Sequence, residues 1–292
     1  MKLLKAYRKI SDLPLHRLLK GTAGRMLMSV RPDLSNEIRN KPFSNHPPLS
    51  GRLIRNGHFM KAVGDEDHAM IRDFLRDYWS SGASDEFYEG LSHRYETLFL
   101  AYHSSIVDET RRVMADMPAP LRRMVEIGSG DGKILDHFRR CLPDLAEFHG
   151  VDVNLPQVEN NRRIHAESGR MWFHHSDGLR WLEQNGGRGT VLVTNGGVLE
   201  YFTRPELQGL FGRMGREWGN CVVSLTESIA ADHDLAREPG TYPYGWELSL
   251  SHNYVALLQE AGFTITHVND RLTTPEEADT VGRWLQVVAV AP

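Results

Sequence analysis

The residues whose spacing suggests chemistry most directly are three glycines at alternate positions, Gly128, Gly130 and Gly132. Glycine tolerates positive φ angles and lets the backbone approach a ligand closely, so this spacing predicts a tight turn with outward-facing N–H groups. The apolar run 124–127 precedes the turn, and apolar residues recur after it at helical spacing. A strand, a glycine turn and a helix in this order are typical of the nucleotide-binding opening of a doubly wound α/β domain.

The residues around the glycines narrow the choice of ligand. A dinucleotide-binding loop has its third glycine where this chain has Lys133, and a P-loop needs Ser or Thr after its lysine, which this chain lacks. The pattern Glu126-x-Gly128-x-Gly130-x-Gly132 instead resembles motif I of the class I S-adenosylmethionine (SAM) dependent methyltransferases. SAM carries an ammonium and a sulfonium but no phosphate, so a carboxylate beside the loop suits SAM and would repel a pyrophosphate. The alternative is an ordinary glycine-rich turn in another α/β protein.

Two further acids stand at the ends of expected strands. Asp152 lies 20 residues past Gly132, about where nucleotide-binding folds hold a ribose, and a carboxylate can accept both O–H groups of a vicinal diol. The resemblance implies that Val153 covers one face of the adenine and that Asp177 accepts from the adenine amino group. Asp177 could equally cap the helix that begins at Gly178.

The segment after the fourth expected strand bears on the acceptor. Enzymes that methylate the amino groups of nucleobases or glutamine carry Asn/Asp-Pro-Pro-Tyr here, and the missing proline pair argues against base N-methylation. The segment 195–202 looks like the G-x-L-E-H/Y-F stretch of small-molecule methyltransferases. The cofactor-binding residues that the resemblance implies are Glu126, Gly128, Ser129, Gly130, Gly132, Asp152, Val153, Asp177, Gly178, Asn195 and Gly196.

A general base is the part of the chemistry that no motif fixes. Methyl transfer is an in-line displacement in which positioning does much of the work, and a nucleophile of high pKa also needs a base. Groups at the carboxyl ends of parallel strands face the ligand crevice, and the candidates there are Glu200, Tyr201, Glu227 and His252. Imidazole titrates near neutral pH, and the polar neighbours of His252 predict that its ring is not sealed in the core. The alternative for His252 is helix capping or a place on the surface.

The resemblance implies an enzyme that methylates an O or N nucleophile of a small-molecule acceptor, with SAM as cofactor. Anionic, glycan-like, lipid-like and natural-product acceptors all stay open. An RNA methyltransferase is the runner-up among enzymes, and a SAM-fold binding protein without catalysis is the alternative from another class. No DNA partner is expected, and no metal is expected because a paired metal-binding carboxylate motif is not evident.

The elements that position these residues read as a Rossmann-like, doubly wound α/β sheet of seven strands. The expected strands are 124–127, 147–154, 171–174, 190–195, 221–227, 263–268 and 284–290. The last two read as the crossed hairpin that closes a methyltransferase sheet with an antiparallel final strand, which a dehydrogenase lacks.

Three segments are expected along the chain. Residues 1–62 hold 13 Lys and Arg against three acids, so this basic extension carries +10 while the rest carries −14. Parts of 1–30 have helical periodicity interrupted by Pro14, and 31–62 read as extended or loop. Residues 63–120 are expected to form a helical cap, with helices at 67–79 and 86–117, and 121–292 the methyltransferase domain. The basic extension is a structural arm, a membrane or anionic surface contact, or, with less support, a nucleic-acid or targeting segment.

Composition excludes several classes. Two cysteines, Cys141 and Cys221, are too few for a disulfide framework, and a reducing, cytoplasmic setting is the default expectation. No apolar run reaches the roughly 18 residues of a membrane span, and the N-terminus lacks the apolar core of a secretory signal. Peripheral contact with a membrane through 1–62 stays open.

Overall fold

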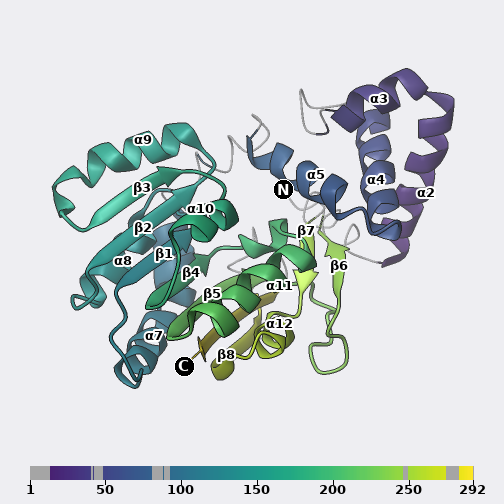
Figure 1. Ribbon diagram of the computed structural model, residues 1–292. Coiled ribbons are helices and arrows are strands. Elements are labelled where there is room, and N and C mark those ends of the chain that lie inside the picture. The colour runs from purple at the N-terminus through teal and green to yellow at the C-terminus, as the bar shows by residue number, and fades with distance from the viewer. Residues whose placement is uncertain are drawn as a thin grey trace. The chain divides into compact units, whose positions relative to one another are not determined.

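The computed structural model describes residues 14–40, 42, 49–80, 88, 93–245, 249–273 and 283–291 (Figure 1). The chain divides into two compact units. The first consists of 1–86, 201–203 and 241–251, and the second consists of 87–200, 204–240 and 252–292.

The second unit is built on a seven-stranded sheet in the order β3-β2-β1-β4-β5-β9-β8. Its strands are β1 (Arg123–Ile127), β2 (Glu147–Asp152), β3 (Met171–His175), β4 (Thr190–Asn195), β5 (Cys221–Ser228), β8 (Thr264–Leu272) and β9 (Arg283–Ala291). The first five strands pair in parallel, and β9 is antiparallel to both of its neighbours. The predicted doubly wound sheet with an antiparallel last strand is confirmed.

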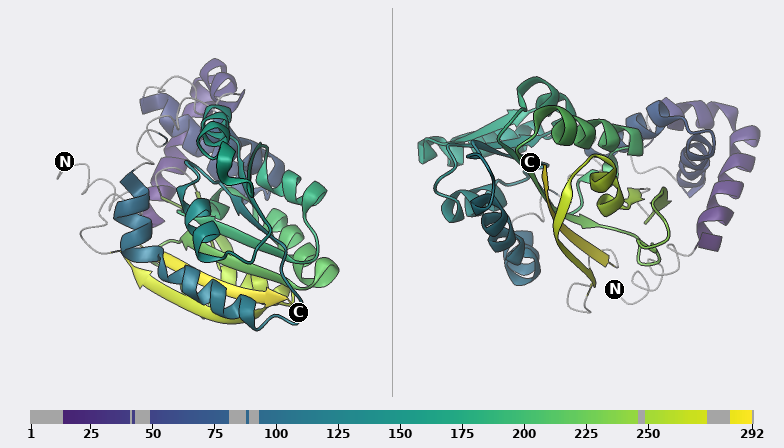
Figure 2. Two further views of the ribbon diagram at one scale, coloured as in Figure 1. Left: turned by 90° about the vertical axis from the view of Figure 1, so that its left-hand side faces the viewer. Right: turned by 60° about the horizontal axis from the view of Figure 1, so that its bottom comes forward.

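Helices cover both faces of this sheet (Figures 1 and 2). One face carries α7 (Ser105–Ala115), α8 (Lys133–Cys141) and α9 (Leu155–Ile164), and the other carries α10 (Gly178–Asn185), α11 (Arg204–Gly212) and α12 (Tyr254–Glu260). One hydrophobic core cluster fills the space under α7, α8 and α9, and it includes the fully buried side chains of Phe138 and Phe148. Shorter helical segments are η2 (Tyr95–His103), η3 (Ala166–Ser168), η4 (Leu199–Tyr201) and η5 (Arg213–Trp218).

The first unit is mainly helical. It contains α2 (Pro14–Val30), α3 (Pro32–Asn40), α4 (Leu49–Gly64), α5 (His68–Ser80) and most of the hairpin β6 (Thr241–Tyr244) and β7 (Ser249–His252). Helices α2 and α4 cross closely at Gly24. A Cβ on this residue would lie only 2.0 Å from the carbonyl oxygen of Leu53, so the crossing needs a glycine here. Among the described residues, no helix has the length and hydropathy to cross a membrane.

Part of the helical structure differs from the sequence expectation. The segment 31–62, expected to be extended or loop, contains α3 and most of α4, so that expectation was wrong. Pro14 is the first residue of α2, because the fixed φ and missing N–H of proline are tolerated in a first helical turn. The predicted boundary at residue 62 falls inside α4, where Ala62 is buried.

The helices expected before the sheet agree better. Helix α5 confirms the helix expected at 67–79. In the described part of 86–117, η2 joins α7 through Ser104, whose backbone is also helical, so one long helical path runs from 95 to 115. The first half of that path is π-helical, and residues 86, 87 and 89–92 lie outside the described part of the chain.

Candidate cofactor site

The candidate site lies at the carboxyl ends of the parallel strands. Strand β1 lies between β2 and β4, and the chain leaves β1 toward α8 on one face and β4 toward α11 on the other (Figure 1). Ligands of open α/β sheets bind in the crevice that such a divergence opens. The predicted cofactor residues therefore meet at one edge of the second unit.

The glycine loop after β1 has the predicted backbone. Gly128, Gly130 and Gly132 have φ angles of +69°, +48° and +73°, all in the left-handed region. A Cβ on Gly128 would lie 2.7 Å from Cγ2 of Val198, and one on Gly132 would lie 2.9 Å from the Phe173 ring. These two positions therefore need glycine for space as well as for conformation.

Asp152 holds the loop from across the end of β2. Its Oδ2 accepts the Gly130 N–H at 2.9 Å, and its Oδ1 accepts the Asn154 N–H at 2.9 Å and the Tyr88 hydroxyl at 3.2 Å. Asp152 is buried, and burial raises its pKa while these donors oppose the rise. An oxygen that already accepts an O–H at this place is chemically suited to a sugar hydroxyl.

Sequence reasoning missed two residues, one bonded to Asp152 and the other bonded to the glycine loop itself. The Tyr88 hydroxyl donates to Asp152, and the buried Asn161 of α9 donates from Nδ2 to the Gly130 carbonyl at 2.7 Å. Gly130 is thus held at its N–H by Asp152 and at its C=O by Asn161. No local motif marks either residue, because each lies far along the chain from the group that it bonds.

Three carboxyl groups lie close together at the loop. Glu126 is buried, and burial, with the neighbouring Asp131 and Asp152 carboxylates, raises its pKa well above the ordinary value. Within the described part of the chain, Glu126 Oε2 and Ser129 Oγ have no hydrogen-bond partner. A ligand with a cationic group and hydrogen-bond donors would satisfy both the charge and the orphaned oxygens. These residues therefore fit the ammonium of SAM.

Asp177 and Gly178 have clear structural roles. Asp177 Oδ1 accepts the Arg180 N–H at 3.0 Å and so caps α10. A Cβ on Gly178 would lie 2.4 Å from Cγ2 of Ile127, so α10 starts in close contact with β1. Val153, at the end of β2, is 37% exposed and available to cover a ligand. The adenine contacts of Val153 and Asp177 stay predictions.

Glu227 holds residues 195–202, the segment that follows β4, which we call the β4 segment. It is fully buried in β5, its Oε2 accepts the N–H groups of Val198 and Leu199 at 2.8 and 2.9 Å, and its Oε1 accepts the Thr194 hydroxyl at 2.5 Å. Burial raises the pKa of Glu227 to about 8 against the hydrogen bond from Thr194. Because Val198 lies against Gly128, Glu227 ties the β4 segment to the glycine loop.

Asn195 and Gly196 lie at the start of the segment that Glu227 holds. Asn195 ends β4, and Gly196, with a φ of +93°, donates its N–H to the Thr226 carbonyl at 3.1 Å. The segment thus begins on a backbone bond to β5 and continues through the bonds to Glu227.

The other two candidates near β4 lie in different environments. Glu200 is buried, and a Cβ on Gly197 would lie 2.5 Å from its Oε1. Tyr201 belongs to the first unit, where its ring stacks with Tyr78 at 6.3 Å and meets the edge of Trp79 at 4.9 Å. The sequence neighbours Glu200 and Tyr201 are therefore assigned to different units.

His252 is fully buried, so the expectation of an open ring was wrong. It ends β7, next to the N-cap of α12, and its ring lies 5.5 Å from that of Tyr254. Its polar neighbour Asn253 is buried too. The burial is tolerated because the Asn253 side chain accepts the Ala256 N–H and donates to the Leu235 carbonyl. Polar residues at a helix start satisfy one another locally, so they do not indicate exposure.

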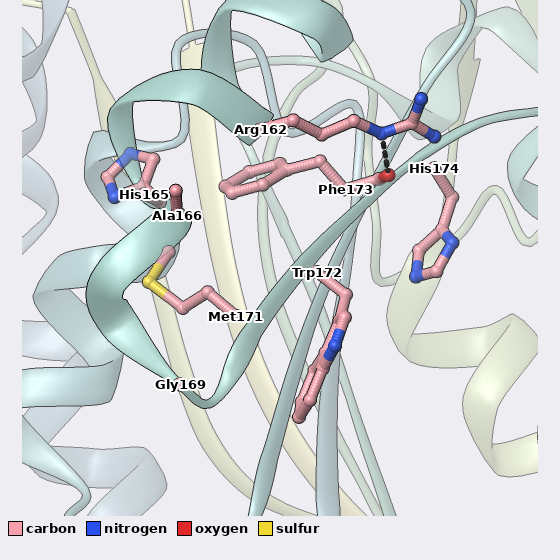
Figure 3. A pocket seen from close by; sticks show the side chains of 8 residues that line it. All are labelled: Arg162, His165, Ala166, Gly169, Met171, Trp172, Phe173 and His174. Atoms are coloured by element: carbon pink, nitrogen blue, oxygen red, sulfur yellow. Dashed lines mark hydrogen bonds between the residues drawn. The ribbon is translucent and has the colours of Figure 1, made fainter.

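A separate pocket lies along the edge strand β3 (Figure 3). Figure 3 shows Phe173, Met171 and His165 on the α9 side of the strand, with Trp172 and His174 on the other side. Arg162 Nε donates to the Phe173 carbonyl at 2.8 Å and so caps an outward-facing group of the edge. None of the predicted cofactor residues lines this pocket. The described residues also contain no group of three His, Cys, Asp or Glu placed to hold a metal.

Comparison with known proteins finds similarity in structure but not in sequence. No profile of a known protein family matches the chain, and no curated relative matches it in sequence. A magnesium protoporphyrin IX methyltransferase from Synechocystis PCC 6803 with bound SAM is similar with a TM-score of 0.50 and 15% identity, over 76% of this chain and 97% of that one. A SAM-dependent methyltransferase from Leishmania major is similar with a TM-score of 0.50 and 13% identity, over 75% of this chain and 82% of that one. The chain therefore has the fold of the class I SAM-dependent methyltransferases.

Proposed function

We propose that this chain is a SAM-dependent methyltransferase that transfers a methyl group to an O or N nucleophile of a small molecule. The observation that carries the proposal is the glycine loop with Glu126 buried below it and Asp152 bonded across it. The Synechocystis methyltransferase of the same fold has been crystallised with SAM and with its demethylated product S-adenosylhomocysteine.

In this proposal, different residues bind the methionine, ribose and adenine parts of SAM. The backbone from Gly128 to Gly132 and the Gly196 turn accommodate the methionine end, with the Glu126 carboxylate toward the ammonium. Asp152 accepts from the ribose hydroxyls, and Val153 and Asp177 flank the adenine. When bound, SAM supplies an electrophilic methyl group on its sulfonium. The chain's own part is to hold that ligand in line with the acceptor and away from bulk water.

The acceptor is proposed to be a small molecule because the β4 segment lacks the proline pair of base methyltransferases. Glu200, Tyr201, Glu227 and His252 remain the candidates for a base. The three donors on Glu227 favour a positioning role for that residue, because its oxygens are already engaged.

Titration calorimetry with SAM and S-adenosylhomocysteine tests the cofactor, and both are expected to bind to one site per chain. Turnover is then followed by release of S-adenosylhomocysteine in the presence of small-molecule extracts and, separately, of RNA. Release that depends only on the small-molecule fraction supports the proposal. Release only with RNA makes the chain an RNA methyltransferase, binding without any release makes it a binding protein, and no binding of either ligand removes the proposal.

Asp152→Ala is expected to weaken SAM binding by about ten- to a hundredfold, because a charge-assisted hydrogen bond contributes roughly 1.5–3 kcal/mol. The matched control is Asp234→Ala, which removes a carboxylate that accepts the Ala236 N–H in a surface turn of the same unit. Calorimetry on both variants, with circular dichroism to verify folding, makes the comparison. Wild-type affinity in a folded Asp152→Ala variant would show that another group holds the ribose.

His252→Ala tests the base. If His252 removes the acceptor proton, kcat should fall by roughly 10²–10⁴-fold with SAM affinity unchanged. Because the ring is fully buried, the melting temperature is measured on the same variant. A lower melting temperature with kcat intact in the remaining folded protein would identify His252 as a packing residue and leave Glu200 or Tyr201 as the base.

A further inference from the structure

Helix α2 of the first unit exposes three large apolar side chains along one face. Leu19, Ala23, Met26 and Val30 recur at intervals of four, three and four residues, which places them on one face of a helix. Leu19, Met26 and Val30 are 58%, 67% and 73% exposed. We call Leu19, Met26 and Val30 the outer stripe.

The opposite face of α2 explains why the outer stripe is free. Gly21 and Gly24 are buried against α4, where a Cβ on Gly21 would lie 3.2 Å from Cγ of Met60. An amphipathic surface helix ordinarily packs its large apolar residues on the core and turns its small or polar ones to solvent. Here the glycine face makes the intramolecular contact, so the outer stripe does not serve the packing of this unit.

The charge around the outer stripe is positive. Helix α2 contains no acidic residue, and its basic residues include Lys20 and Arg25, with Arg31 directly after its end. Residues 1–62 carry 13 Lys and Arg against three acids. A helix with an exposed apolar stripe among basic side chains has the composition of one that lies in the interface of an anionic bilayer.

We propose that α2 docks this protein on an anionic lipid surface, with the outer stripe at the level of the acyl chains and the basic residues among the headgroups. A second copy of the chain is the other occupant that the stripe would suit. Pairing two segments that each carry an excess of ten positive charges opposes that contact, whereas negative lipids favour docking. The proposal does not depend on methyl transfer.

Flotation with vesicles of phosphatidylcholine mixed with phosphatidylserine tests the proposal on the full chain. Wild type is expected to bind these vesicles, to bind pure phosphatidylcholine much more weakly, and to be released by salt. Met26→Glu is expected to lower binding by roughly tenfold or more, because it removes an apolar side chain that the bilayer would bury and adds a charge that the lipids repel. The matched control is Leu272→Glu on β8 of the second unit, a leucine that is 66% exposed and should leave binding unchanged.

Each result decides the proposal. Equal loss of binding in Met26→Glu and Leu272→Glu would mean that total charge, not the outer stripe, governs contact. Absence of wild-type binding to the anionic vesicles overturns the proposal. A wild-type dimer in light scattering that Met26→Glu dissociates would assign the stripe to a second copy instead. Circular dichroism of both variants, compared with wild type, confirms that they are folded.

Discussion

Gly130→Val is expected to lower the affinity for SAM by about tenfold to a hundredfold or more in a chain that still folds. A φ of +48° at Gly130 costs a β-branched residue on the order of 1–3 kcal/mol of backbone strain. The cheapest relief is a movement of the loop, which breaks the bonds from Gly130 N–H to Asp152 and from Asn161 to the Gly130 carbonyl. The valine side chain also occupies space where the ligand has to approach the backbone. Calorimetry measures the affinity, and urea unfolding measures the stability.

Gly169→Val separates these effects. Gly169 has a φ of +67°, and a Cβ there would meet nothing within 4 Å, so valine adds comparable strain without adding contacts. It lies outside the glycine loop, between η3 and β3. We expect both variants to lose stability and only Gly130→Val to lose SAM affinity. If both bind SAM as wild type does, the loop does not hold the cofactor.

The sheet could be predicted from the sequence because its signals are local. Two of the parallel strands, at 124–127 and 190–195, are short runs followed directly by a glycine, and stretches of helical periodicity alternate with the strands. The positive φ angles of Gly128, Gly130 and Gly132 follow from the same stretch of chain. Features of the fold that depend on consecutive residues could therefore be predicted from the sequence.

The first unit shows where local reasoning fails. Proline and asparagine in 31–62 suggested loop, yet α3 and α4 form there because proline stands at helix starts and tertiary packing overrides weak propensity. The contact of Gly24 with α4 depends on two helices far apart in sequence. No periodicity within either helix specifies that crossing.

In the candidate site too, some residues could be predicted from local sequence and others depend on tertiary structure. Glu126 and Asp152 could be predicted because strand ends are recognisable, whereas Tyr88 bonds Asp152 and Asn161 bonds the glycine loop from remote segments of the chain. His252 was misjudged because its polar neighbour Asn253 caps α12 and is buried despite its polarity. Glu227 was recognised as an acid at a strand end, but its hydrogen-bond partners on the β4 segment depend on the pairing of β4 with β5.

Replacement of Glu227 is expected to have the largest effect on stability. Glu227→Ala leaves the Val198 and Leu199 N–H groups and the Thr194 hydroxyl without their acceptor. Each buried donor left unpaired costs about 1–3 kcal/mol, so the free energy of unfolding should fall by roughly 3 kcal/mol or more. SAM affinity should fall as well, because Val198 moves away from Gly128. Glu227→Gln is the matched variant, since its carbonyl oxygen can accept both N–H groups and its amide can donate to Thr194.

The pH dependence identifies the carboxyl group itself. Burial raises the pKa of Glu227 from 4.5 to about 8, so between these two pH values the folded chain holds a proton on this carboxyl group that the unfolded chain releases. The stability that this group contributes is therefore fully present below about pH 4.5 and is lost as the pH rises through about 8. Glu227→Gln cannot titrate at this position. Its free energy of unfolding should therefore rise relative to that of wild type as the pH increases across this window. The contributions of the histidines are common to both proteins and cancel in the difference. Urea unfolding at a series of pH values gives the difference. Parallel curves would mean that Glu227 stays ionised in the folded protein and holds the β4 segment as a carboxylate, and loss of SAM binding in Glu227→Gln with stability intact would return Glu227 to the candidates that act on the ligand directly.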